Sequence, residues 1–144
     1  TVLHQSTADE NAVAHFTARI EQVWPALALA YSELGIEPTV IDRAGWRYGN
    51  TGFIVPRRIQ GRPIANYFNC GSGISGQLVD LGRVYANVTT TLTANPDGST
   101  SGVTHISASV RSNDGSSTSA VNCGSTGAIE GYIHSATEKH STGH

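Results

Sequence analysis

The sequence predicts an α+β fold, in which an antiparallel sheet carries a long helix from the N-terminal half and a C-terminal helix on one face, in the order β-α-β-β-β-β-α. Two stretches with the three- and four-residue spacing of a helix support this class, as do two long alternating stretches joined by a turn. The chain has 144 residues, which fits one domain with its own core. We expect residues 1–139 to form that domain and residues 140–144 to be a polar tail.

The N-terminal part is predicted to be strand followed by helix. Residues 1–17 contain two β-compatible pieces around a polar turn at residues 6–11, the second piece being residues 12–16. From residue 18 an apolar stripe predicts a helix that ends at Gly35, the C′ glycine. Thr17 is the expected N-cap, and Pro25 should either kink the helix or mark a late start. The stripe consists of Ile20, Val23, Trp24, Leu27, Ala30, Tyr31 and Leu34.

The middle of the chain is predicted to be mostly β. Residues 38–43 and 46–58 should pair around a turn at residues 44–45, with a bulge at residues 50–52. Residues 60–63 break the pattern, residues 64–69 lead to Cys70, and residues 71–76 form a flexible loop. Residues 82–94 and 99–112 should form a long hairpin, because Pro96 and Gly98 suit positions i+1 and i+3 of the turn between them.

The C-terminal part is predicted to be loop, strand, helix and tail. A loop at residues 113–117 precedes a short strand at residues 119–121, which reaches Cys123. Ser125 or Thr126 is the expected cap of a helix, and from residue 135 on the polar chain should fray. The apolar face of that helix carries Ile129, Tyr132, Ile133 and Ala136.

The two cysteines open near-copies of one phrase, since residues 69–72 and 122–125 both read Asn-Cys-Gly-Ser and the chain has no methionine. A matched pair favours one structural disulfide between Cys70 and Cys123 over a redox-active pair, because neither lies in a Cys-x-x-Cys motif. A disulfide belongs to an oxidising compartment. We therefore expect an extracytoplasmic protein, in the periplasm or on the outer cell surface, that has lost a signal peptide ahead of Thr1. No apolar run approaches the roughly 18 residues of a membrane-spanning helix.

No motif indicates a cofactor or a metal site. Residues 71–76 read G-x-G-x-x-G, but a cysteine precedes them and no good helix follows, so we expect no nucleotide there. The histidines match no familiar ligand spacing, so we expect no metal. Three of them lie near the C-terminus, close to Glu138, and three lie on strand-like segments: His134, His140 and His144, and His4, His15 and His105.

We also expect that the protein is not an enzyme. The nucleophile motif G-x-S-x-G does not occur. His105 could be grouped with Asp80 or Asp114 in a triad, but any serine-rich chain allows such a grouping. The acidic residues are scattered, and several fall in turns: Asp42, Asp80, Asp97, Asp114 and Glu130.

Arginine and aromatic residues gather between positions 43 and 62, which hold five of the eight arginines. Both residue types are enriched at protein interfaces, so we expect a protein partner to bind there. The alternative is that the aromatic rings face the core while the arginines protect an edge strand from aggregation. The net charge of -2 predicts no binding to nucleic acid. The expected partner-binding residues are Arg43, Trp46, Arg47, Tyr48, Arg57, Arg58 and Arg62.

Residues 16–18, 23–27 and 34–36, followed by a strand pair, resemble the opening of helix-grip domains in small bacterial envelope proteins, such as the repeat domains of the BamC lipoprotein. The phrases at Cys70 and Cys123, the second of which ends at residues 127–130, are similar to those of a group of exported bacterial proteins. The resemblance implies a non-catalytic accessory domain that docks on a larger envelope assembly. It carries over no functional residues.

The sequence therefore favours a non-catalytic exported accessory subunit on a cell-envelope or membrane complex, such as an outer-membrane assembly or a photosynthetic reaction centre. Under this hypothesis, Arg57→Ala with Trp46→Ala should release the partner without unfolding the protein. One alternative is an extracytoplasmic hydrolase, with a serine or histidine and a carboxylate in one cleft. The other is a carrier of a small hydrophobic ligand, with a cavity lined by Trp24, Leu27, Tyr31, Val88 and Ile106.

Overall fold

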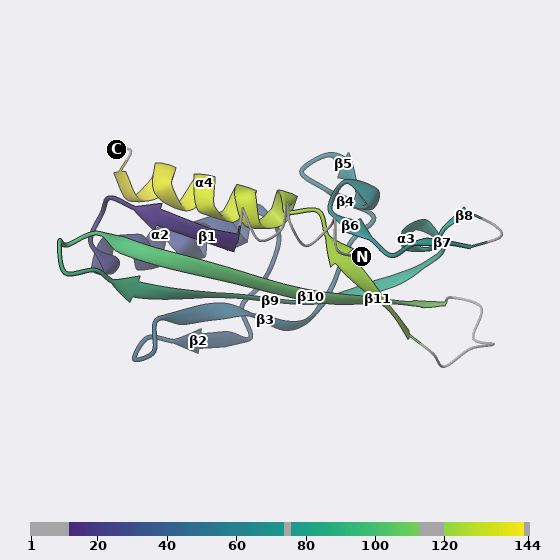
Figure 1. Ribbon diagram of the computed structural model, residues 1–144, viewed down its shortest axis with the longest axis horizontal. Coiled ribbons are helices and arrows are strands. Elements are labelled where there is room, and N and C mark those ends of the chain that lie inside the picture. The colour runs from purple at the N-terminus through teal and green to yellow at the C-terminus, as the bar shows by residue number, and fades with distance from the viewer. Residues whose placement is uncertain (1–11, 74–75, 113–119, 143–144) are drawn as a thin grey trace.

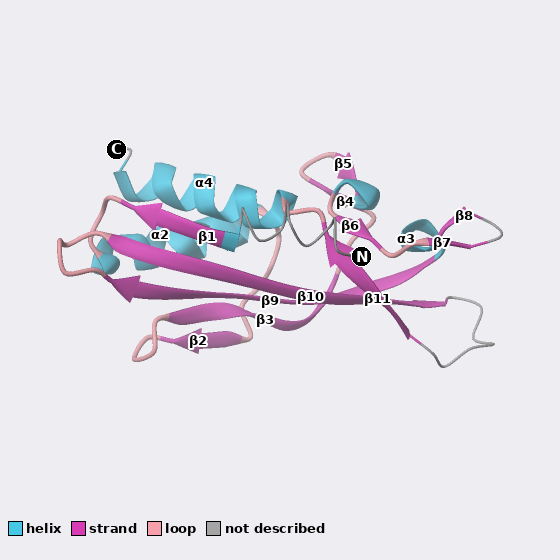
Figure 2. Ribbon diagram, in the orientation of Figure 1, coloured by secondary structure: helices cyan, strands magenta, loops and turns pink. Residues whose placement is uncertain are grey.

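A computed structural model describes residues 12–73, 76–112 and 120–142, and it confirms the α+β class. Figures 1 and 2 show how its strands and helices are arranged. The expected loop at residues 113–117, the turn at residues 6–11, and His4, Asp114 and His144 lie outside the described residues. The elements are β1 (Val13–Phe16), α2 (Ile20–Glu33), β2 (Val40–Asp42), β3 (Arg47–Ile54), β4 (Arg58–Ile59), β5 (Arg62–Pro63), a 3₁₀ helix η1 (Ile64–Asn66), β6 (Phe68–Asn69), β7 (Ser72–Gly73), β8 (Gly76–Gln77), α3 (Leu78–Leu81), β9 (Gly82–Ala94), β10 (Thr100–Ser112), β11 (Ala120–Ser125) and α4 (Ala128–Thr142).

The main sheet is antiparallel, in the order β2-β3-β9-β10-β11-β6. Strand β10 pairs with β9 along one side and with two shorter strands along the other, β1 over its first half and β11 over its second. Helices α2 and α4 pack against each other on one face of this sheet (Figure 1). The core lies between that face and the helices, as the single cluster of buried apolar residues shows.

Helix α2 begins at Ile20, two residues later than predicted. The predicted Thr17 cap is wrong: Arg19 is the N-cap and makes no side-chain capping bond. The late start at Pro25 is also wrong, since Pro25 lies inside the helix. The predicted C-terminus is confirmed, because Gly35 has φ 76° and the N–H of Ile36 donates to the Tyr31 carbonyl at 3.0 Å, the pattern of a Schellman motif.

The long hairpin is confirmed almost to the residue. Strand β9 covers residues 82–94 as predicted, and β10 starts at Thr100. The turn between them closes with a bond from the Gly98 N–H to the Asn95 carbonyl at 3.0 Å, and Gly98 has φ 91°. The side chains of β9 alternate between buried and exposed, so every second residue from Gly82 to Leu92 faces the helices.

The strand pair β2–β3 and its bulge are confirmed, since the register of β3 on β9 shifts between Thr51 and Phe53. Strand β3 ends at Ile54, however, and a separate two-residue hairpin, β4–β5, follows. Its turn residues Gln60 and Gly61 both have positive φ, which suits a tight hairpin turn. In the segment that leads to Cys70, η1 occupies residues 64–66, and Phe68–Asn69 is the short strand β6.

Two further expectations about loops and ends differ from the structure. The described parts of the loop at residues 71–76 are the paired strands β7 and β8. The fraying expected from residue 135 does not occur, because α4 is helical to Thr142. Its last turns are held by burial of Thr137 and Ser141 and by the His140 Nε2 atom, which lies 2.8 Å from a carboxylate oxygen of Glu33. None of the described helices is long and apolar enough to cross a membrane.

Candidate functional site

The predicted disulfide is confirmed, and it joins the two cysteine phrases side by side. Cys70 and Cys123 are bonded with their Cα atoms 4.1 Å apart. Strand β6 pairs with β11 so that Asn69 lies opposite Gly124, which makes the repeated phrase a strand pair. Because disulfides persist where thiols are not kept reduced, the bond indicates a non-reducing, extracytoplasmic setting.

The same strand pair leads directly into α4. The hydroxyl of Thr126 donates to the Asn66 carbonyl at 2.8 Å. The hydroxyl of Ser125 accepts from the Gly127 N–H and donates to the carboxylate of Glu130 at 2.8 Å. Ser125 therefore orders the start of α4 in the manner of a capping residue. Glu130 is only 2% exposed, and this burial raises the pKa of its carboxyl group.

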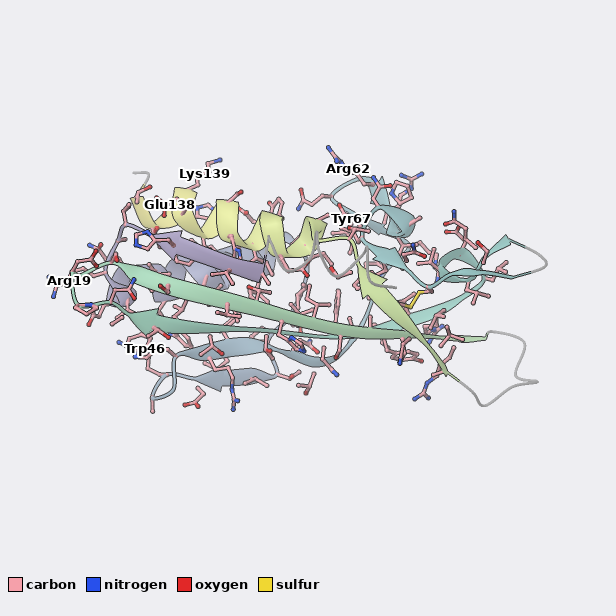
Figure 3. All side chains as sticks on the ribbon, in the orientation of Figure 1. Arg19, Trp46, Arg62, Tyr67, Glu138 and Lys139 are labelled. Carbon is pink, nitrogen blue, oxygen red and sulfur yellow. A yellow bond between two sulfur atoms is a disulfide. The ribbon has the colours of Figure 1, made fainter. Side chains whose placement is uncertain are left out.

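The structure divides the predicted arginine–aromatic cluster into two groups. Trp46 and Arg62 lie far apart, Trp46 toward the left end on the lower side in Figure 3 and Arg62 on the upper side. The aromatic members point inward. The Trp46 ring packs edge-on against Trp24 at 5.6 Å between centroids, and Tyr48, 8% exposed, packs against Trp24 and Tyr31. Tyr48 is therefore a core residue and not available to a partner.

The exposed members of the first group lie on what we call the edge hairpin, residues 40–47. The guanidinium of Arg43 lies 4.5 Å from the centroid of the Trp46 ring, a cation–π arrangement that fixes its position. Arg47 is exposed at the start of β3, opposite Asp42. Ile41 is 64% exposed, on the strand that ends the order of the main sheet. It pairs with Tyr48 and so points to the helix side of the sheet, whereas Arg47 pairs with Thr91 and points to the opposite side. The edge hairpin thus exposes one large apolar residue and two cations.

The second group lies at β4, β5 and the segment before them. Arg58 and Arg62 are exposed on opposite strands of the β4–β5 hairpin. Arg57 donates to the carbonyls of Val79, at 2.9 Å, and of Asp80 and Gly82. Val79 and Asp80 lie in the short helix α3 and Gly82 follows it, and the carbonyls at a helix C-terminus need donors from outside the helix. The expectation that Arg57 can be removed without structural effect therefore does not fit its contacts.

The cavity expected for a carrier coincides with the packed core. Leu27, Tyr31 and Val88 are fully buried in the core cluster, and Trp24 and Ile106 pack against it. A chain of buried hydroxyl groups crosses this region. Tyr31 Oη lies 2.9 Å from Thr90 Oγ1, which lies 2.7 Å from Thr104 Oγ1. Thr104 Oγ1 lies 2.8 Å from His134 Nε2, so the chain links α2 to α4 through the sheet.

The hydrolase alternative requires a serine, a histidine and a carboxylate in contact, and Ser99, His15 and Asp97 form such a group. Ser99 Oγ donates to Asp97 Oδ1 at 2.5 Å and lies 3.0 Å from His15 Nε2. The hydroxyl proton is thus held by the carboxylate, and the imidazole donates to the oxygen instead of accepting from it. For the serine to act as a nucleophile, its hydroxyl must instead donate to the imidazole. The group fastens the β9–β10 turn to β1, and it lowers the pKa of Asp97 through the bonds from Ser99.

The other predicted triad partners lie apart. His105 is opposite Thr89, seven residues along β9 from Gly82, so it is roughly 20 Å from Asp80, at about 3.3 Å per strand residue. Asp114 lies outside the described residues. Within the described ranges, no group of three or more His, Cys, Asp or Glu side chains could hold a metal ion.

A surface that the sequence analysis did not single out is the sheet face opposite the helices, which we call the polar face. Its positions follow from the strand registers, since directly paired residues point to the same side. On β9 and β10 it consists of Arg83, Tyr85, Asn87, Thr89, Thr91 and Thr93, and of Ser101, Val103, His105, Ser107, Ser109 and Arg111. No described helix covers this face (Figure 1).

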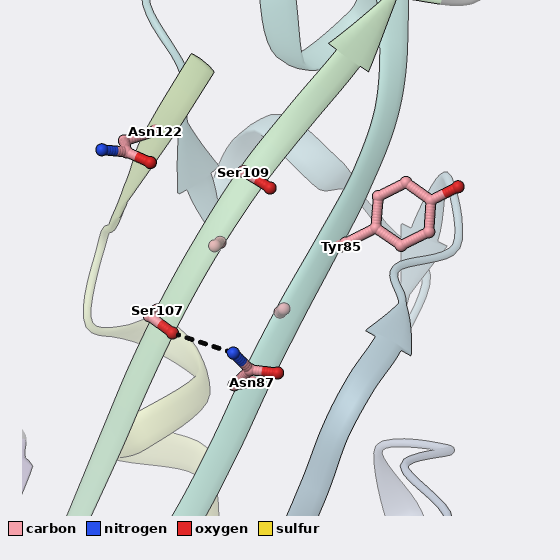
Figure 4. A pocket seen from close by; sticks show the side chains of 7 residues that line it. Tyr85, Asn87, Ser107, Ser109 and Asn122 are labelled. Atoms are coloured by element: carbon pink, nitrogen blue, oxygen red, sulfur yellow. Dashed lines mark hydrogen bonds between the residues drawn. The ribbon is translucent and has the colours of Figure 1, made fainter. Parts of the chain in front are cut away.

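The polar face contains a shallow hollow of about 200 Å³, shown in Figure 4. Tyr85, Asn87, Ser107, Ser109 and Asn122 line it, and Ala86 and Ala108 complete the lining. The side-chain amide of Asn87 donates to Ser107 Oγ at 3.3 Å. The hollow exists because four short side chains adjoin one larger ring. The signal in the sequence was the polar set of alternating residues on β9 and β10. For β9, the sequence analysis considered only the apolar set, which is buried.

Comparisons with protein-family models, with curated proteins and with solved structures find no match for this chain. The geometry of the edge hairpin and of the polar face therefore has to support any functional interpretation.

Proposed function

We propose that this protein is a non-catalytic accessory subunit that docks, in the periplasm or on the outer cell surface, on a larger membrane-associated protein complex. The observation that supports the proposal is the edge hairpin, which exposes Ile41, Arg43 and Arg47 at the edge of the main sheet. The disulfide supports the extracytoplasmic setting.

The edge hairpin has two properties that favour docking of a protein. Strand β2 ends the order of the main sheet, and a partner strand can hydrogen-bond to such an edge. Arg43 is held over the Trp46 ring, so less side-chain freedom is lost when it pairs with a carboxylate. The expected docking site on the partner is an extended acidic segment with an apolar side chain facing Ile41.

A cross-linking experiment tests the proposal in the organism's own extracytoplasmic compartment. A photoreactive amino acid replaces Ile41, and irradiation should join the protein to one subunit of a membrane complex. The control places the same group at Val121, which is exposed on β11, with β3, β9 and β10 between it and β2 in the order of the main sheet. Cross-linking at position 121 to the same subunit, or at position 41 to nothing, would count against the proposal.

A charge-reversal pair adds a matched comparison. Arg43→Glu with Arg47→Glu should abolish the cross-link, because two attractive contacts become repulsive. Arg58→Glu with Arg62→Glu makes the same change in net charge on the β4–β5 hairpin and should leave the cross-link intact. Equal loss in both pairs would mean that net charge, and not the edge hairpin, governs the interaction. Thermal unfolding of both variants confirms that they remain folded.

A further inference from the structure

The polar face differs in composition from a surface that binds proteins. Protein interfaces are enriched in aromatic side chains and depleted in serine. On β9 and β10 this face has one aromatic residue, Tyr85, and eight other positions with a hydroxyl or amide side chain or a histidine. Such a surface offers many donors and acceptors but little apolar area, which suits a ligand that is itself covered with hydroxyl groups.

The hollow concentrates these groups. Asn87 and Asn122 are exposed on its two sides, and Ser107 and Ser109 lie between them on β10. The amides supply both donors and acceptors, and the hydroxyls supply either, so the pairs of neighbouring hydroxyls on a sugar ring can be bound from several directions. The half-buried ring of Tyr85 borders the site and offers an apolar edge to the carbon atoms of a sugar (Figure 4).

On the described strands, the charged residues next to the hollow are both positive. Arg83 and Arg111 form the cross-strand pair next to Tyr85 and Ser109, and the Arg111 guanidinium lies 5.3 Å from the centroid of the Tyr85 ring. Within the described strands Asp42 is the only acidic residue, and one of its oxygens accepts the Gly45 N–H at 3.0 Å. This positive charge contrasts with the net charge of -2 of the chain as a whole.

We propose that the polar face binds an acidic polysaccharide, with a sugar unit in the hollow lined by Asn87, Ser107, Ser109 and Asn122 and a neighbouring uronate carboxylate paired with Arg111 and Arg83. Guanidinium groups bind carboxylates with two parallel hydrogen bonds, which gives the arginines their role. This proposal does not depend on docking through the edge hairpin, because the two surfaces share no side chain that either proposal uses.

The test is titration calorimetry of the full-length oxidised protein with a galacturonic acid hexamer. Binding should be detected, should weaken as salt is added, and should be at least about tenfold tighter than binding of a neutral glucose hexamer, because a paired guanidinium contributes on that scale. A hexamer of glutamic acid should also bind at least about tenfold more weakly, since it has the carboxylates without the hydroxyl groups. Equal binding of all three hexamers, or none by the galacturonate, overturns the proposal.

Substitutions locate the site. Asn122→Asp places a carboxylate beside the hollow, and Arg111→Gln removes the cation, so each should reduce galacturonate affinity by on the order of tenfold. Arg58→Gln removes an exposed arginine on β4, away from the polar face, and should leave the affinity unchanged. Unchanged binding by both polar-face variants, or equal loss in Arg58→Gln, contradicts the assignment. Matching unfolding curves exclude loss of folding as the cause.

Discussion

Replacing both cysteines by alanine should remove a large part of the protein's stability. The disulfide joins residues 53 positions apart, and restricting a loop of that size in the unfolded chain is worth about 4 kcal/mol in the chain-entropy relation. A domain of this kind has a total stability of roughly 5–15 kcal/mol. Cys70 is buried and Cys123 is partly so, hence alanine, which adds no polar group, is the suitable replacement.

The assay is urea unfolding of three samples: the oxidised protein, the same protein with reductant, and Cys70→Ala with Cys123→Ala. The last two should lose similar free energies of unfolding, and reductant should have no effect on the alanine variant. Hydrogen exchange should show the first loss of protection in β6 and at the start of α4, while the β9–β10 hairpin remains protected. A loss below about 1 kcal/mol would refute the view that this cross-link stabilises the fold.

Three other substitutions test particular contacts. Tyr31→Phe removes the first hydroxyl of the buried chain to Thr90 and should lower the free energy of unfolding by about 1–2 kcal/mol in urea; a loss near zero would mean that the chain contributes nothing. The raised pKa of buried Glu130 means that the native state binds its proton more tightly than the unfolded state does. This group's contribution to stability is therefore full below its pKa in the unfolded state and is lost as pH rises through its pKa in the folded state. Glu130→Gln should therefore gain stability relative to the natural protein as pH rises from 4 to 7, and a constant difference across this range would contradict the sign. Gly49→Ala should destabilise by at least about 2 kcal/mol in the same assay, because a Cβ there would lie 2.1 Å from the Val88 carbonyl oxygen; an unchanged midpoint would show that β3 can move away from β9.

Where local physics decides the structure, the sequence predicted it well. The hairpin of β9 and β10 could be placed because Pro96 and Gly98 fix the turn and the flanking residues alternate strictly. The end of α2 was equally clear, since Gly35 takes the positive φ that a Schellman motif needs. The disulfide followed from the cysteine count alone.

Tertiary contacts explain the misplaced elements. The C-terminal residues look like a polar tail, but on α4 the small side chains Thr137 and Ser141 are buried, and His140 pairs with Glu33 of α2. Nothing local in the sequence reveals that pairing. Likewise, Arg57 belongs to an arginine-rich segment, and only its three carbonyl partners show that it is structural.

The candidate sites could be predicted only in part. Arg43 and the Trp46 ring could be grouped from the sequence, because a short hairpin brings them together. The polar face could not be predicted without the strand register, because Asn122 lies beside Ser109 only through the pairing of β11 with the second half of β10. The spacing of residues in the sequence does not determine whether β11 pairs with β9 or with β10, or in which register.

The placement of charge gives the two proposed surfaces a common physical basis. Apart from Asp42, the described carboxylates lie in helices, turns and connecting segments, whereas Arg47, Arg83 and Arg111 lie on strands and point away from the helices. The residues that stabilise the fold are different ones: the disulfide, the buried hydroxyl chain and Arg57. Because exposed cations and stabilising contacts are separate, substituting the cations should change binding while leaving unfolding nearly unaffected. A variant of Arg111 or Arg47 that unfolded readily would show that these arginines support the sheet, and both binding proposals would then lose their charge argument.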